Sequence, residues 1–142
     1  MLSLDSTLPP EVCDASVWYG PHYKRQNDWM VCLSGAEIAE VQTAVEQIEQ
    51  QSIDLTTITA QDVSLPTLGP RLRGMLDEVL KGRGFVLIKG LPVGRWTKRQ
   101  AAVAFLVVGV QLGNLRMQNA EGHLLGHVRD LGRSSSDPNT RI

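Results

Sequence analysis

Three histidines, His22, His123 and His127, are the side chains of this sequence best suited to metal binding or acid–base chemistry. His123 and His127 are four residues apart, a spacing that places two zinc ligands on one face of a helix. The intervening Leu124-Leu125-Gly126 lacks the glutamate base of such a helix and ends in a helix-disfavouring glycine. On a strand the two histidines would share a face about 13 Å apart, too far to hold one ion. We therefore interpret them as polar residues of a half-exposed strand, with a ligand contact by either one as the alternative.

A mononuclear iron centre of two histidines and a carboxylate has a local signature, His-x-Asp or His-x-Glu, whose two side chains point to one side of a strand. None of the histidines has this partner, since Asp130 lies three residues beyond His127 and would face the opposite side. The G-x-S-x-G, P-loop and G-x-G-x-x-G motifs are also absent. We predict no catalytic residue and no metal ligand in this chain. A further alternative is a zinc site made of Cys13, Cys32, His123 and His127.

The composition is that of one small globular domain, with 142 residues, 42% hydrophobic residues and a net charge of -1. Such a nearly neutral chain gives no reason to expect nucleic acid or a membrane surface as partner. The longest apolar run, residues 101–110, is about half as long as a membrane-spanning helix. Because no signal peptide is visible, we expect a soluble, cytoplasmic protein with reduced cysteines. A basic cluster is interpreted as a solvated rim, with a phosphate or nucleic-acid patch as the alternative: Lys81, Arg83, Lys89, Arg95, Lys98 and Arg99.

Helix signals recur at three places along the chain. Ser34 and Glu37 form a capping box that opens a helix to about Gln51, with a buried stripe of Ile38, Val41, Val45 and Ile48. Pro70 marks the start of a second helix that ends at Gly82. A capping box at residues 97–100 opens a third helix, through about residue 110. Between the last two helices, residues 84–90 form a short apolar run that predicts a strand buried on both faces.

The remaining segments define the domain organisation. Residues 1–30 are predicted to be an irregular N-terminal arm, with aromatic anchors or merely scattered aromatics at Trp18, Tyr19, Tyr23 and Trp29. Residues 31–131 are predicted to form the domain, in which residues 114–118 and 123–130 are extended and joined by a turn at residues 120–122. Residues 132–142 are predicted to be a loop or disordered tail. The inventory of helices and few strands predicts an α+β fold.

Four stretches together resemble the N-terminal region of the taurine-dioxygenase-like (TauD/TfdA-type, clavaminate-synthase-like) oxygenases. They are VWYGP (17–21), LPTLGP (65–70), GRGFVLIKGLP (82–92) and QNAEGHLLGHVRD (118–130). The resemblance covers nearly all of residues 17–140. It implies the helix and strand portion of a double-stranded β-helix, or jelly roll, with the barrel incomplete.

The resemblance also implies a chemistry, in which Fe(II), 2-oxoglutarate and O2 oxidise a small organic substrate. The His-x-Asp pair, the distal histidine and the 2-oxoglutarate-binding arginine of these enzymes come after the matched region. We therefore expect the chain to stop before its metal ligands, to bind neither cofactor alone and to be inactive by itself. Gln118, Asn119 and His123 are the implied candidates for lining a substrate pocket.

An incomplete barrel would leave strand edges and apolar faces without partners. We therefore expect the isolated chain to be marginally stable or to associate with itself. The alternative to an oxygenase fragment is a small non-catalytic interaction module that pairs with a full-length relative.

Overall fold

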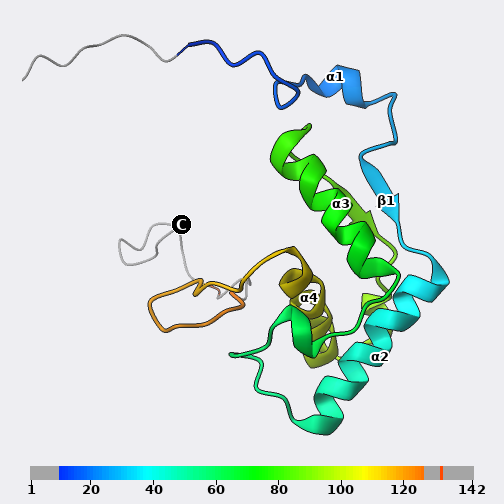
Figure 1. The fold of residues 1–142 in the computed structure, drawn as a ribbon, viewed down its shortest axis with the longest axis vertical. Coiled ribbons are helices and arrows are strands. Elements are labelled where there is room, and N and C mark those ends of the chain that lie inside the picture. Colours follow the sequence, from blue (N-terminus) through cyan, green and yellow to red (C-terminus); the bar gives the residue numbers. More distant parts are fainter. Residues whose placement is uncertain (1–9, 127–131, 133–142) are drawn as a thin grey trace, which may run out of the picture.

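The computed structural model describes residues 10–126 and residue 132 (Figure 1). Within them, helices and a two-stranded parallel sheet make up an α+β structure, as the sequence predicts. The elements in chain order are α1 (Gly20–Tyr23), β1 (Met30–Cys32), α2 (Gly35–Gln51), the 3-10 helix η1 (Ala60–Asp62), α3 (Leu68–Lys81), β2 (Leu87–Lys89), the 3-10 helix η2 (Val93–Arg95) and α4 (Lys98–Leu112).

Helix α2 follows its sequence signals closely. The Ser34 hydroxyl accepts the Glu37 amide N–H, and the Glu37 carboxylate accepts the Ser34 N–H, which confirms the capping box. Val41, Val45 and Ile48 of the predicted stripe are buried. The helix ends at Gln51 because Ser52 adopts the left-handed conformation, with φ of 50°.

Helix α3 begins two residues before the predicted start at Pro70, which lies in its first turn. The N-cap residue, Thr67, makes no side-chain cap of its own. Instead the Glu40 carboxylate of α2 accepts the N–H groups of Thr67 and Leu68 at 3.0–3.1 Å. A carboxylate at a helix N-terminus satisfies free donors and complements the helix dipole. The earlier start thus depends on a residue 27 positions away in the chain.

The core lies between α2, α3 and α4, with the segment around η1 completing it. Helix α4 packs against both other helices. Its capping box between Thr97 and Gln100 is confirmed, and the helix ends two residues past the predicted end at residue 110. Burying apolar side chains at one helical junction supplies most of the stability of a domain of this size. The seven largest fully buried side chains are Ile48, Leu68, Leu72, Val41, Val45, Val103 and Val107.

Strand β2 differs from the prediction of a strand over residues 84–90 that is buried on both faces. It spans three residues and pairs in parallel with β1, which the sequence did not reveal, in the register Met30↔Leu87. Val86 and Ile88 pack against the helical core, whereas Leu87, on the opposite face, is 42% exposed. The prediction of two buried faces was wrong because the described helices cover one face only, and side chains alternate with period two.

The residues after α4 form a loop where the sequence predicted extended segments. Among residues 114–126 there is no strand, so that part of the prediction was wrong, and residues 127–130 lie outside the described residues. One backbone hydrogen bond, from the Gln118 N–H to the His123 carbonyl at 2.7 Å, closes this loop. The predicted turn is present, with a bond from Gly122 N–H to the Asn119 carbonyl and a φ of +82° at Gly122. A single bonded pair lacks the ladder that makes a strand.

The N-terminal arm is attached to the body by aromatic rings. The rings of Trp18, Tyr23 and Trp29 surround Phe85, which precedes β2, with centroid distances of 5.0, 5.4 and 5.9 Å. Tyr19, also predicted as an anchor, is 74% exposed and takes no part. Helix α1 interrupts an arm that was predicted to be irregular. Anchoring by three of the four aromatics is therefore a feature of the structure, while the division at residue 30 stays a prediction.

Arg83 departs from the interpretation as part of a solvated basic rim. Its side chain is only 15% exposed, and it forms ion pairs with Asp28 at 3.1 Å and with Glu78 at 2.8 Å. Its guanidinium also lies over the Tyr23 ring, 5.9 Å from the centroid. The two carboxylates raise the pKa of Arg83, and the guanidinium holds the pKa values of Glu78 and Asp28 below their ordinary range. Arg83 therefore links the arm to the end of α3.

Helices of the length and apolar content required to cross a bilayer do not occur in the described part of the chain.

Candidate functional site

The three predicted pocket residues lie in the loop that follows α4. Gln118, Asn119 and His123 are all exposed, and each makes short contacts within the loop. The Gln118 side chain donates to the Arg116 carbonyl at 2.9 Å. The Asn119 side chain instead binds His123 twice: its Oδ1 accepts the His123 backbone N–H at 3.0 Å, and its Nδ2 lies 2.8 Å from the ring nitrogen Nδ1. The structure thus joins Asn119 to His123 and leaves the Gln118 side chain apart from them.

An apolar groove of about 360 Å³ lies between this loop, α4 and the segment after α2. His123 lines it, whereas Gln118 and Asn119 do not. Volumes of this size are at the lower end of those found for small-molecule sites. The signal for this groove in the sequence was the pair of leucines, Leu124 and Leu125, directly after His123. The lining residues are Leu55, Thr56, Arg99, Ala102, Leu106, Gly122, His123, Leu124 and Leu125.

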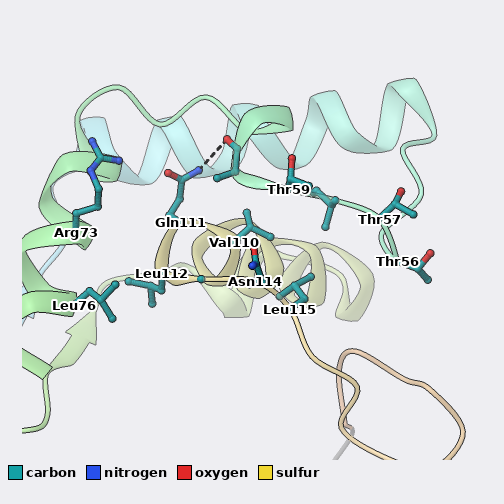
Figure 2. A pocket seen from close by; sticks show the side chains of 13 residues that line it. Thr56, Thr57, Thr59, Arg73, Leu76, Val110, Gln111, Leu112, Asn114 and Leu115 are labelled. Atoms are coloured by element: carbon teal, nitrogen blue, oxygen red, sulfur yellow. Dashed lines mark hydrogen bonds between the residues drawn. The ribbon is translucent and has the colours of Figure 1, made fainter. Parts of the chain in front are cut away.

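A second groove, of about 420 Å³, lies between the threonine-rich segment after α2 and the C-terminal end of α4 (Figure 2). Arg73 lies at one end and Thr56 at the other, and the Gln111 amide donates towards the Val63 and Ala60 carbonyls at 3.3 and 3.5 Å. The hydroxyl of Thr56 already donates to Asp54. Arg73 makes no ion pair with any other described residue. This groove was not predicted from the sequence, where its only local signal is the run of threonines at 56, 57 and 59.

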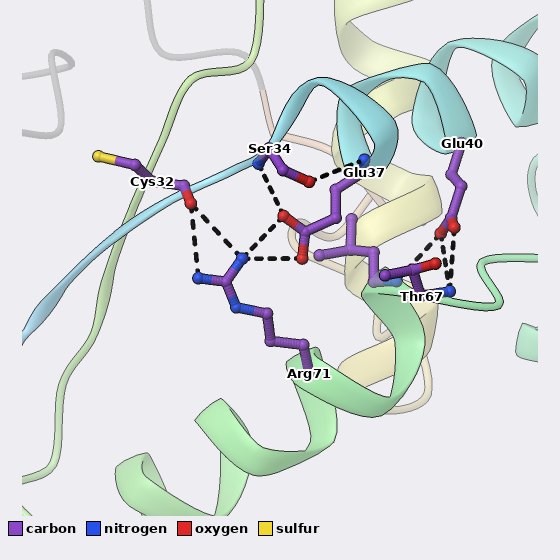
Figure 3. Close-up of polar contacts among 7 residues, drawn as sticks. Cys32, Ser34, Glu37, Glu40, Thr67 and Arg71 are labelled. Atoms are coloured by element: carbon purple, nitrogen blue, oxygen red, sulfur yellow. Dashed lines mark hydrogen bonds and ion pairs between the residues drawn. The ribbon is translucent and has the colours of Figure 1, made fainter.

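Among the described residues, the most buried charged side chain is that of Glu37 on α2, which is 2% exposed and faces α3 (Figure 3). Its two carboxylate oxygens accept Arg71 Nη1 at 2.7 and 2.8 Å, and Arg71 also reaches the Cys32 carbonyl at 3.5 Å. The Ser34 N–H completes the set of donors at 2.7 Å. This network ties the end of β1 to both helices. Because every donor serves the fold, we assign it a structural role.

Acid is expected to weaken this part of the fold. The Arg71 guanidinium and the Ser34 N–H hold the pKa of Glu37 below its ordinary value of 4.5, against the effect of burial. For Glu40, burial raises the pKa, but the Leu68 and Thr67 donors outweigh it and lower the pKa overall.

A carboxylate whose pKa is lower in the folded state stabilises the fold above its unfolded pKa, and this contribution is lost as the pH falls through the folded value. We therefore expect the free energy of unfolding to fall from about pH 4.5 downwards, by at most about 1.4 kcal/mol per pH unit for each carboxylate. Urea unfolding at a series of pH values measures this, and Glu37→Gln should show a shallower decline. An equal slope in that variant would assign the acid sensitivity to other groups.

The described residues do not fit an iron or zinc centre. Within residues 10–126 and 132, no three histidine, cysteine, aspartate or glutamate side chains lie close enough to share an ion. Cys13 and Cys32 are both exposed, and the nearest polar partner of His22 is Gln26 at 3.3 Å. His127 and Asp130 lie outside the described residues.

Comparison with curated proteins bears on the family resemblance. Over 124 residues, 87% of this chain, the sequence is 29% identical to a taurine hydroxylase-like protein of Stachybotrys chartarum. This chain is a relative of that protein. It is also 26% identical over 133 residues, 94% of the chain, to the FR-33289 synthase of Streptomyces rubellomurinus. The resemblance to the taurine-dioxygenase-like proteins, predicted from four short stretches, is confirmed by these two relatives.

The two alignments cover most of this chain but only a minor part of each relative. The aligned residues make up 32% of the fungal protein and 39% of the bacterial one, so the chain spans about a third of the length of these curated relatives. No known family profile matches the chain.

Proposed function

We propose that this chain is the N-terminal portion of a taurine-dioxygenase-like Fe(II)/2-oxoglutarate oxygenase, and that it is inactive by itself. The observation that carries the proposal is the relation to the two curated proteins, which runs through most of this chain and occupies about a third of theirs. On this proposal the iron, the 2-oxoglutarate and most of the substrate pocket are held by residues outside residues 10–126.

The described fold suits the outer, helical part of a jelly roll. Three helices bury one another's apolar faces, but the short sheet has two strands and an outward face at Leu87. Leu80, Leu87 and Phe105 are 69%, 42% and 65% exposed. Further structure packed on these faces would bury the three side chains and join them to a larger apolar contact. We propose that the rest of the jelly roll covers these positions.

When bound, iron and 2-oxoglutarate would supply the oxidation of a small organic substrate. The contribution we propose for this chain is confined to the loop after α4. His123 would line the substrate pocket from the mouth of the groove, Asn119 would hold the His123 ring, and Gln118 would line the adjoining wall. These roles concern binding and orientation only.

A turnover assay tests the proposed inactivity. The purified chain is incubated with Fe(II), ascorbate, 2-oxoglutarate and taurine, and succinate is measured against an iron-only control. We expect no succinate above the control and no stoichiometric iron after desalting, because the described residues provide no ligand set. Succinate formation in excess of the control would overturn the proposed inactivity.

The gene provides a second test. The DNA that follows the Ile142 codon is translated in all three forward frames. An encoded His-x-Asp motif, followed much later by a histidine and an arginine, would show that the chain is the front of an ordinary oxygenase. If no such motif follows in any frame, an inactive remnant is favoured.

A second candidate function is a non-catalytic module that pairs with a full-length relative. The exposed Phe105 and Leu87 favour it, because an interaction surface needs apolar side chains that the chain does not cover itself. Size-exclusion chromatography of the chain mixed with a full-length relative tests it. Co-elution that is lost in Phe105→Ser would support pairing, and separate elution would exclude it.

A further inference from the structure

The groove beside His123 combines an apolar floor with few polar groups. Leu55, Ala102 and Leu106 lie on one side, and Leu124 and Leu125 on the other. An apolar cavity with one or two well-placed polar groups is the usual form of a small-molecule site, because apolar contact gives affinity and the polar group gives orientation.

The His123 ring is held in one tautomer by Asn119. The backbone N–H of His123 can only donate, so the Asn119 atom that it contacts at 3.0 Å must be the carbonyl oxygen Oδ1. The other end of the same amide, Nδ2, is therefore a donor, and it lies 2.8 Å from the ring nitrogen Nδ1. Nδ1 must accept, so the proton of the neutral ring is on Nε2. No described residue is paired with Nε2.

The charges around the groove nearly balance. Arg99 lines it, but its side chain is 67% exposed and lies 3.7 Å from the Glu49 carboxylate. The Glu121 carboxylate lies 3.4 Å from Nδ1 of the His123 ring, farther from it than the Asn119 Nδ2 at 2.8 Å. Two carboxylates and one guanidinium give an anionic ligand no net attraction, and neither carboxylate is among the residues that line the groove, where a cationic ligand would need one.

We propose that this groove binds an uncharged small molecule with an aliphatic body and a carbonyl oxygen. The body lies against the leucines, and the carbonyl accepts the Nε2–H of His123. The proposal names a ligand class for the substrate pocket proposed above, and to that extent it rests on the proposed function. Asn119 is a positioning residue, since it acts through the His123 ring.

Four probes of one shape test the proposal: cyclohexanone, methylenecyclohexane, cyclohexanecarboxylate and cyclohexylammonium. Binding is followed by the NMR shifts of the Leu106, Leu124 and Leu125 methyl groups in the full chain. We expect cyclohexanone to bind with a Kd on the order of 1 mM. It should bind about fivefold tighter than methylenecyclohexane, which lacks only the acceptor. Equal binding of these two, tightest binding of either charged probe, or no shift with any probe would overturn the proposal.

Variants of His123 separate the hydrogen bond from the apolar contact. His123→Leu should remove the preference for the ketone over the alkene, while His123→Gln, whose side-chain amide can replace the Nε2–H donor, should keep most of it. His22→Leu, at an exposed histidine outside the groove, is the matched control and should leave the preference unchanged. A preference that survives in His123→Leu would show that His123 is not the donor.

The tautomer is measured directly from long-range 1H–15N correlations of the imidazole ring. We expect a proton on Nε2 in the uncharged ring and a mixture of tautomers in Asn119→Ala. A proton on Nδ1 in the unaltered chain would refute the assignment. None of these measurements requires turnover, so the ligand class and the proposed oxygenase relation can fail separately.

Discussion

Replacing Arg71 with methionine is expected to lower the free energy of unfolding by about 2–3 kcal/mol. Glu37 is 2% exposed in the unaltered chain, and without Arg71 its carboxylate keeps only the donors of Ser34 outside its own helix. Removing one partner of a buried pair costs about 3–5 kcal/mol, because the other charge stays desolvated. We expect the smaller loss of about 2–3 kcal/mol because the Arg71 side chain is 43% exposed, so that water can reach the carboxylate once the guanidinium is gone.

Lys81→Met is the matched control on the same helix. Lys81 forms an ion pair of similar length, 2.8 Å, with Asp77, but the two side chains are 76% and 66% exposed. Such surface pairs contribute between zero and about 1 kcal/mol, so this variant should unfold nearly as the unaltered chain does. Equal effects of Arg71→Met and Lys81→Met in urea unfolding would show that burial of Glu37 adds nothing.

A double variant isolates the cause. Glu37→Gln in the Arg71→Met background removes the unpaired negative charge of the buried carboxylate but keeps an oxygen that can accept the Ser34 N–H. We expect it to recover at least about 1 kcal/mol of the loss. The deficit of Arg71→Met should also shrink below about pH 4.5, because protonation neutralises the buried Glu37. A deficit that is constant with pH would assign the loss to the packing of the arginine stem instead.

Local signals in the sequence predicted the helices well and the strands poorly. Each capping box joins residues three apart, so Ser34 with Glu37 and Thr97 with Gln100 fix their helix starts without help from the rest of the chain. The start of α3 depends instead on Glu40, which belongs to another helix. Strand β1 has three residues and no apolar pattern of its own, and only its pairing with β2 defines it.

The candidate site shows the same limit. His123 and Asn119 were chosen from the sequence as pocket residues, but nothing in their spacing revealed that one would hold the ring of the other. That contact requires the turn at Gly122, which brings residues four apart into contact. The groove itself also needs Leu55 and Thr56 of the segment after α2, which lie far from this loop in sequence. Cavities between such segments depend on tertiary packing, which the hydrophobic periodicity of a sequence does not reveal.

Phe85→Ala is expected to detach the N-terminal arm and to cost about 2–3 kcal/mol of the free energy that holds it in place. Phe85 is the common neighbour of three rings of the arm, at 5.0–5.9 Å, and is itself half-buried. Full truncation of a core phenylalanine costs about 3–5 kcal/mol, and partial exposure reduces that value. Trypsin cleavage at Lys24 and Arg25, which follow α1, should become at least tenfold faster, because cleavage of a locally opened segment follows the population of the open form.

The second phenylalanine of the chain provides the control for this prediction. Phe105 is 65% exposed on α4, so Phe105→Ala should change stability by less than about 0.5 kcal/mol and leave cleavage of the arm unchanged. Phe85→Leu should fall between the two, since it keeps apolar volume but loses the edge-on ring contacts. Arg83 and Asp28 are unchanged in every variant, so an arm that stays protected in Phe85→Ala would show that their ion pair, and not the rings, holds it.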